Sequence, residues 1–233
     1  MSSILKITGL TKRFGKVTAL DGLDLNLEFG SIHGFVGPNG AGKTTMLSIV
    51  SGLRRKTSGD ITFNVPENRR MLMPDTPDFF PLLTAREMVD LARYPFRKEV
   101  SEKSVARVIE EVGLANSIDR RVGGFSRGMK QRLGLATALI AEPQLLLLDE
   151  PCSALDPIGR REVLDAILQL KSKATVLFST HILSDVEAVC DSVTVVDNGR
   201  SLYGGTVDDI SSSAGQSFED AVLALLRPAG NAK

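Results

Sequence analysis

Apolar residues follow β-strand patterns towards both ends of this chain and a helical pattern between them. Residues 4–29 read as β, most clearly where Leu23, Leu25 and Leu27 alternate with Asp24 and Asn26. Further strands are predicted from short apolar segments at residues 31–36, 61–63, 145–148, 175–180 and 193–196.

Two of these segments say more about the sheet. Four consecutive leucines at 145–148 suit a strand that is buried on both faces of a parallel sheet. The Asp197-Asn198-Gly199 sequence predicts a hairpin between residues 193–196 and 200–203. The chain therefore combines a parallel core with antiparallel parts.

Residues 84–141 repeat apolar side chains at helical spacing. Thr84 and Glu87 form a capping-box pattern, and Ser126 is a candidate N-cap for a helix that carries Leu133 and Ala136 on one face. The proline-rich passage 73–81, which precedes this block, is predicted to be a loop. A helical block between strands indicates an inserted helical subdomain.

A glycine-rich loop between a predicted strand and a predicted helix fits the pattern G-x-x-x-x-G-K-[ST]. Its glycines let backbone N–H groups turn towards an anion, and the helix adds its positive N-terminal end. Lys43 can neutralise the outer phosphates of a nucleotide, and the Thr44 hydroxyl can hold Mg²⁺. The predicted nucleotide contacts are Gly37, Pro38, Asn39, Gly40, Ala41, Gly42, Lys43, Thr44 and Thr45.

Polar residues that end predicted strands supply the remaining chemistry. In a protein with such a loop, Asp149 is placed to approach Mg²⁺, and Glu150 can aim at an attacking water. His181 follows the strand 175–180 at the sheet edge where ligands bind, which suggests a γ-phosphate contact. Phe14 lies in a polar stretch, where it could offer its face to a base or simply pack. His33, on the strand that leads into the loop, is interpreted as structural.

Composition narrows the class of protein. The 233 residues suffice for one large domain or for a domain with an inserted lobe. Lysine plus arginine equals aspartate plus glutamate at 28 each, so no net field predicts a nucleic-acid partner. No apolar run approaches the length of a membrane span. Cys152 and Cys190 lack metal-ligand spacing, which favours a reduced, cytoplasmic setting.

Taken together, these motifs resemble those of the nucleotide-binding subunits of ABC transporters. Phe14 matches the aromatic residue that stacks on adenine, Ser153-Ala154-Leu155-Asp156 matches the D-loop, and His181 matches the switch histidine. Residues 126–132 resemble the signature motif, with Ser126 and Gly128 at the positions that meet a γ-phosphate.

The resemblance implies an α/β fold: a P-loop NTPase core with a mainly parallel sheet, an N-terminal antiparallel β subdomain and an inserted helical subdomain. It divides the single ATPase domain into a core at 1–75 and 142–233 and a helical lobe at 76–141. It also implies that two ATPase subunits, either two copies or a copy and a homologue, sandwich two ATP molecules head to tail. Ser126, Gly128 and Asp156 then join the nucleotide contacts.

The implied partner is a separate integral-membrane permease, which would hold the chain at the inner face of the membrane. Residues 126–129 and 218–222 look most like subunits of exporters of drugs, lipids or polysaccharides. Two alternatives stay open at this point. One is a soluble ABC ATPase that works on nucleic acid or ribosomes, and the other is a regulatory ATP-binding module with low hydrolysis.

The chain departs from the family pattern at several positions. Phe125, Arg127 and Met129 replace the usual signature residues, and Asp75 stands where a glutamine normally touches Mg²⁺ and the attacking water. Asp75 could serve as a metal ligand. We expect instead that its shorter side chain points to solvent and leaves the site one ligand short.

Overall fold

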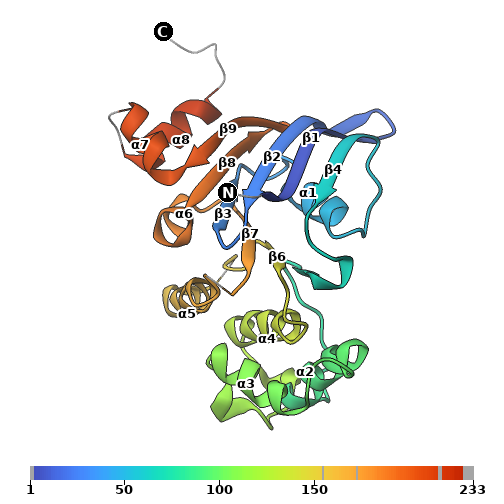
Figure 1. Ribbon diagram of the computed structural model, residues 1–233. Coiled ribbons are helices and arrows are strands. Elements are labelled where there is room, and N and C mark those ends of the chain that lie inside the picture. The colour runs from blue at the N-terminus through green and yellow to red at the C-terminus, as the bar shows by residue number, and fades with distance from the viewer. Residues whose placement is uncertain (1–2, 154, 172, 215–216, 228–233) are drawn as a thin grey trace.

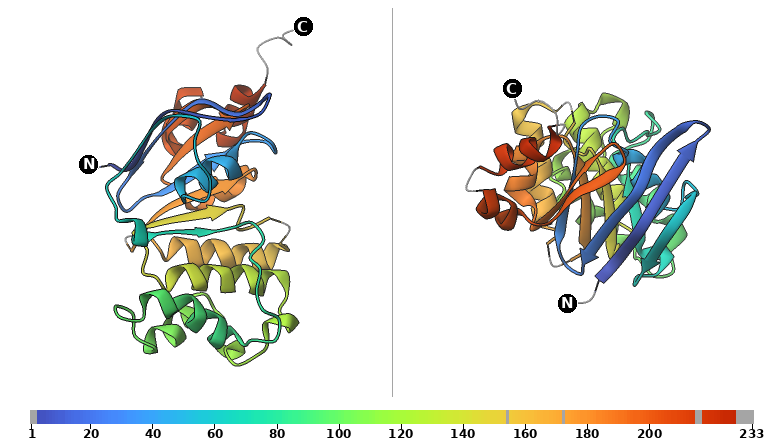
Figure 2. Two further views of the ribbon diagram at one scale, coloured as in Figure 1. Left: turned by 90° about the vertical axis from the view of Figure 1, so that its right-hand side faces the viewer. Right: turned by 90° about the horizontal axis from the view of Figure 1, so that it is seen from above.

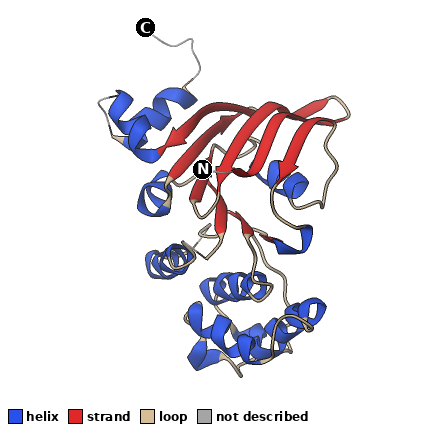
Figure 3. Cartoon of the chain, viewed as in Figure 1, coloured by secondary structure: helices blue, strands red, loops and turns tan. Residues whose placement is uncertain are grey.

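The computed structural model describes residues 3–153, 155–171, 173–214 and 217–227, and it contains two sheets (Figures 1 and 3). The first is antiparallel, in the order β2-β1-β4, from β1 (Ser3–Phe14), β2 (Val17–Glu28) and β4 (Ser58–Phe63). The second has the order β5-β6-β7-β3-β8-β9, and only its β8–β9 pair is antiparallel. Its strands are β3 (Ile32–Val36), β5 (Arg70–Met73), β6 (Leu145–Asp149), β7 (Thr175–Thr180), β8 (Ser192–Asp197) and β9 (Arg200–Thr206).

The helices fall into groups that cover different parts of these sheets. In Figure 1, α2, α3 and α4 gather at the end of the molecule opposite β1 and β2, and Figure 2 shows α4 beside α5 beneath the strands. Short 3₁₀ turns occupy residues 67–69, 94–96, 115–117 and 122–124. The α-helices are α1 (Lys43–Val50), α2 (Ala85–Arg93), α3 (Lys103–Glu111), α4 (Arg127–Leu139), α5 (Pro157–Leu168), α6 (Leu183–Val189), α7 (Val207–Ala214) and α8 (Phe218–Leu226).

The four leucines of β6 are completely buried, as expected for a central parallel strand. Leu145 and Leu147 belong to the core that α1 shares with the antiparallel sheet. Leu146 and Leu148 face the opposite way, into the core shared with α4 and α5. Strand alternation therefore divides one leucine run between two cores, and it holds the end of β6 rigidly between them.

The fold class predicted from the sequence is confirmed, including the mainly parallel core, the antiparallel N-terminal sheet and the helices between strands. The Thr84 capping box and the Ser126 N-cap are both present. Three elements were not predicted: β5, α6 and α7. Each has only four to eight residues, too few to display a period above the background of the surrounding chain.

The loop after β5 packs closely on α4. A Cβ atom placed on Gly134 would lie 2.7 Å from Pro77 Cγ, so glycine is what allows this approach.

The division into a core and a helical lobe at residues 75/76 and 141/142 stays a prediction. Within the described ranges, no helix combines the length and the apolar character needed to cross a membrane.

His33 occupies a structural position in β3. Its ring is buried, with Nδ1 2.7 Å from Ser192 Oγ and Nε2 2.9 Å from Thr194 Oγ1 of the neighbouring strand. Burial lowers the pKa of His33 from 6.5 to about 4, because the charged ring would lose its hydration.

We expect His33 to make stability depend on pH. Between pH 6.5 and about 4, His33 is protonated in the unfolded chain but stays neutral in the folded chain. The free energy of unfolding is therefore highest above pH 6.5 and falls as the pH decreases through this range. The loss from pH 7 to pH 5 should be on the order of 2 kcal/mol. Urea unfolding of the parent and of His33→Gln at both pH values measures it. Equal pH slopes for the two proteins would contradict the assignment.

Candidate functional site

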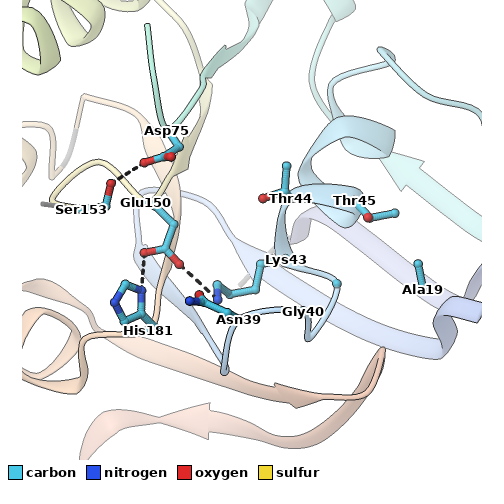
Figure 4. A pocket seen from close by; sticks show the side chains of 11 residues that line it. Ala19, Asn39, Gly40, Lys43, Thr44, Thr45, Asp75, Glu150, Ser153 and His181 are labelled. Atoms are coloured by element: carbon cyan, nitrogen blue, oxygen red, sulfur yellow. Dashed lines mark hydrogen bonds and ion pairs between the residues drawn. The ribbon is translucent and has the colours of Figure 1, made fainter.

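The glycine-rich loop connects β3 to α1 and borders a cavity of about 420 Å³ (Figure 4). Gly40 and Gly42 adopt positive φ angles of 85° and 101°. A Cβ atom on Gly42 would lie 2.6 Å from the Ala19 carbonyl oxygen, so the turn requires glycine there. The loop residues that line the cavity are Asn39, Gly40, Gly42, Lys43, Thr44 and Thr45, while Gly37, Pro38 and Ala41 lie outside the lining.

Lys43 is the cation of this cavity, and it is held by three oxygen atoms. Its Nζ donates to the Gly37 carbonyl at 2.7 Å and to the Pro38 carbonyl at 3.2 Å, and it lies 3.1 Å from Glu150 Oε1. The side chains of Lys43 and Glu150 are only 6% and 13% exposed, so water screens their ion pair weakly. Phosphate groups that enter the cavity must compete with Glu150 for the lysine.

Glu150 follows β6 with a left-handed backbone, at φ 47°. Its N–H is held by the Ser179 carbonyl at 3.1 Å and by Ser179 Oγ at 3.0 Å. Its Oε2 lies 2.8 Å from His181 Nδ1, so the carboxylate bridges His181 and Lys43 (Figure 4). The left-handed backbone is held by Ser179 and the carboxylate by Lys43 and His181, so the Glu150 side chain is kept in one position.

Asp149, the last residue of β6, is 4% exposed and is not among the residues that line the cavity. Ser179 Oγ donates to its Oδ1 at 2.7 Å. Burial raises the pKa of Asp149, and hydrogen bonds from Ser179 and Thr44 oppose that rise. A buried carboxylate paired with the Thr44 hydroxyl is a hard-oxygen donor set that suits Mg²⁺, which takes few protein ligands and completes its shell with water and phosphates.

Asp75 does not point to solvent, and that part of our sequence-based prediction is wrong. The side chain is half-buried in the cavity wall, and its Oδ1 accepts a hydrogen bond from Ser153 Oγ (Figure 4). The buried Gln131 of α4 donates to the Asp75 carbonyl at 2.6 Å. The loop is therefore tied to α4 by its backbone and to the segment after Glu150 by its carboxylate.

Four further predicted nucleotide contacts, outside the glycine-rich loop, also lie outside the cavity lining. Phe14, 39% exposed at the end of β1, has Lys12 Nζ 4.9 Å and Arg54 Cζ 5.0 Å from its ring centroid. Asp156 caps α5 by accepting from the Gly159 N–H at 2.7 Å. Ser126 caps α4, and Gly128 packs beside Gly159. Ala154, the second residue of the predicted D-loop, lies outside the described residues.

Three residues support the site in ways that the sequence pattern did not predict. Ser179 orients both Asp149 and Glu150, and Ser153 holds Asp75. Ala19 belongs to β2 but lines the cavity. Two of them had a usable signal in the sequence. Ser179 stands two residues before His181 in a predicted strand, and Ser153 belongs to the D-loop match.

A sequence model of the ABC transporter family matches residues 20–153, which contain the loop, Asp75, Asp149 and Glu150. The chain belongs to this family.

Relatives among characterised proteins agree with this membership. The bacitracin transport ATP-binding protein BcrA of Bacillus licheniformis is 40% identical over 87% of this chain and 69% of its own length. The lantibiotic transport ATP-binding protein SrtF of Streptococcus pyogenes is 38% identical over 94% of this chain and 98% of its own length. A solved ATP-binding subunit of an ABC transporter is 28% identical, with a TM-score of 0.84 over 96% of this chain and 100% of the other.

Membership in the ABC family settles the general activity. The chain is an ATP-binding subunit with ATPase activity that energises a transporter. The cavity bordered by Lys43, Glu150 and His181 lies at the family's phosphate-binding loop.

The position of Asp75 leads to a prediction about metal dependence. Glutamine is one methylene longer and uncharged, so Asp75→Gln should reach further into the cavity and remove a negative charge beside Glu150. We expect turnover to rise several-fold and the Mg²⁺ concentration for half activity to fall.

Steady-state ATPase assays over a magnesium titration measure both effects. Asp75→Asn removes the charge without adding length, and so separates charge from reach. A slower Asp75→Gln, or one that needs more metal, would show that the native carboxylate is a working ligand.

Proposed function

We propose that this chain hydrolyses ATP between two ATPase subunits to drive an exporter of drug type whose permease is a separate chain. The observation that carries the proposal is the bridge from Lys43 through Glu150 to His181 at the phosphate loop. A cation, a carboxylate and an imidazole meet there beside one cavity, and this combination supports a role in phosphoryl transfer to water.

Hydrolysis would use these side chains in separate roles. Water attacks the γ-phosphorus of ATP, the bond to the β–γ bridging oxygen breaks, and ADP and phosphate leave. Glu150 accepts the proton of the attacking water, a role whose loss typically costs about 10²–10⁴-fold in rate. Lys43 leaves Glu150 to neutralise the phosphate oxygens, and His181 orients the γ-phosphate through its exposed ring.

The metal proposal rests on the donor set of the site. Thr44 and Asp149 would hold Mg²⁺, with Ser179 keeping the Asp149 carboxylate in place. The ion would supply positive charge to the phosphate oxygens when bound. Asp75 is close enough to the cavity to modulate this site, in the direction that the magnesium titration decides.

Two of the remaining nucleotide contacts, Ser126 and Gly128, would come from a second subunit. Ser126 and Gly128 stand at the N-terminus of α4, where backbone N–H groups and the helix dipole favour an anion. They lie outside the cavity of their own chain, which supports a head-to-tail pair in which they face the partner's γ-phosphate. Phe14 of the chain that holds the phosphates would stack on the adenine, and Asp156 would lie at the junction of the two subunits.

The transport assignment rests on relatives. BcrA and SrtF are named for bacitracin and lantibiotic transport, so we propose a drug-type exporter with a permease that holds this chain at the inner face of the membrane. A regulatory module with low hydrolysis is the second candidate. The observations that favour it are Asp75 in place of glutamine and a Glu150 already paired with Lys43.

Mixed-mutant complementation tests the two-subunit site. Ser126→Arg should inactivate the signature of its chain, and Lys43→Ala should inactivate the phosphate loop of its own. A mixture forms one complete site from two different chains, so we expect ATPase activity above that of either mutant alone.

The matched control mixes Ser126→Arg with Ser126→Arg/Lys43→Ala. In that mixture every signature is defective, so activity should stay at the background. If the first mixture is no more active than this control, the proposed sharing of sites between subunits is wrong.

A further inference from the structure

Arg160 joins the first turns of two helices that begin beside the candidate site. It lies in the first turn of α5, and its Nε donates to Asp185 Oδ1 at 2.5 Å in the first turn of α6. Its second guanidinium nitrogen donates to Ser184 Oγ at 2.7 Å. One side chain therefore forms hydrogen bonds with two consecutive residues of α6.

The acidic partner is buried more deeply than stability alone would favour. Asp185 is 0% exposed, and its Oδ2 has no hydrogen-bond partner among the described residues. Burial raises the pKa of this carboxyl, against the hydrogen bond and charge of Arg160. A buried carboxylate with one unpaired oxygen is costly, and an apolar residue in its place would avoid that cost.

The first turns of α5 and α6, which Arg160 connects, come shortly after residues with proposed roles in hydrolysis. Helix α6 begins two residues after His181, whose ring contacts Glu150 at 2.8 Å. Helix α5 begins immediately after Asp156, at the end of the segment that starts with Glu150 and contains Ser153. No hydrogen bond or ion pair other than those of Arg160 is described between the side chains of α5 and α6.

We propose that Arg160 and Asp185 are positioning residues that hold His181 against Glu150 by fastening the start of α6 to the start of α5. The inference rests on the proposed roles of Glu150 and His181 in ATP hydrolysis. Movement of the Asp156 end of α5, which the proposed dimer would touch, then reaches His181 through one guanidinium group. Neither residue needs to contact ATP.

The neighbouring residue provides a matched control. Arg161 also lies on α5 and pairs with Asp165 at 3.0 Å, but that pair stays within one helix and is exposed. Arg161→Met therefore removes the same charge from the same helix without loosening α6. A role in helix stability alone predicts similar effects for both arginines.

The chain has only two histidines, which makes His181 directly observable. We would record the ring Cε1–H resonances of nucleotide-free parent, Arg160→Met, Asp185→Asn and Arg161→Met. In Arg160→Met and Asp185→Asn the His181 resonance should shift, while the buried His33 resonance stays in place and reports an intact fold. Arg161→Met should move neither resonance.

The same four proteins would be compared as ATPases. We expect Arg160→Met and Asp185→Asn to lower kcat by about tenfold, with KM for ATP within about twofold of the parent, since misplacing a catalytic group by 1 Å can cost roughly 10²-fold. Arg161→Met should keep the parent kcat. Arg160→Lys keeps the charge but cannot contact Asp185 and Ser184 with two separate nitrogen atoms, so its kcat should lie between those of the parent and Arg160→Met. It replaces Arg160→Met in the comparison if that variant folds poorly.

An unchanged His181 resonance in Arg160→Met and Asp185→Asn would overturn the proposal, whatever happens to kcat. An unchanged kcat alongside a shifted resonance would also overturn it, because the displacement would then have no catalytic consequence. The resonances are measured without nucleotide, so they decide the linkage independently of turnover. A parent protein that hydrolyses no ATP would instead count against the proposed function.

Discussion

The ion pair between Lys43 and Glu150 is the contact on which the site depends. It joins the phosphate loop to the end of β6 in a place that water barely reaches, with the two charged groups 3.1 Å apart. Removing either partner of such a pair leaves a poorly solvated charge, so the pair holds the loop and the proposed base together. In the proposed mechanism ATP binding replaces this contact, because Lys43 then neutralises the phosphates instead of Glu150. The same contact would keep the proposed base restrained until phosphates arrive.

The fold supplies this contact through its two cores. Leu145 and Leu147 hold β6 against α1, and Leu146 and Leu148 hold it against α4 and α5, so Glu150 emerges from a strand clamped on both faces. Ser179 on β7 then orients Asp149 and the Glu150 backbone. The Arg160 contacts extend this frame to α6, and the Gln131 and Ser153 contacts extend it to the Asp75 loop.

The parts of this site that lie within short stretches of sequence could be predicted from the sequence alone. The glycine loop, the carboxylates of Asp149 and Glu150 at the end of β6, and His181 after β7 follow from strand patterns and from the edge at which parallel strands end. The orientation of Asp75 could not be predicted, because it depends on Ser153 and Gln131, 78 and 56 residues further along the chain. The Lys43–Glu150 pair was missed for the same reason. Short elements such as β5 and α6 show no period, and only their packing reveals them.

The central claim is that Lys43 must leave Glu150 when nucleotide binds, and calorimetry of a non-hydrolysable ATP analogue tests it most directly. Glu150→Gln keeps the shape but frees the lysine, so affinity should increase by about tenfold, or roughly 1.4 kcal/mol. Asp75→Asn removes a charge from the same cavity without contacting Lys43, and its gain should be clearly smaller. Equal gains in the two variants, or an unchanged or weaker affinity in Glu150→Gln, would contradict the account.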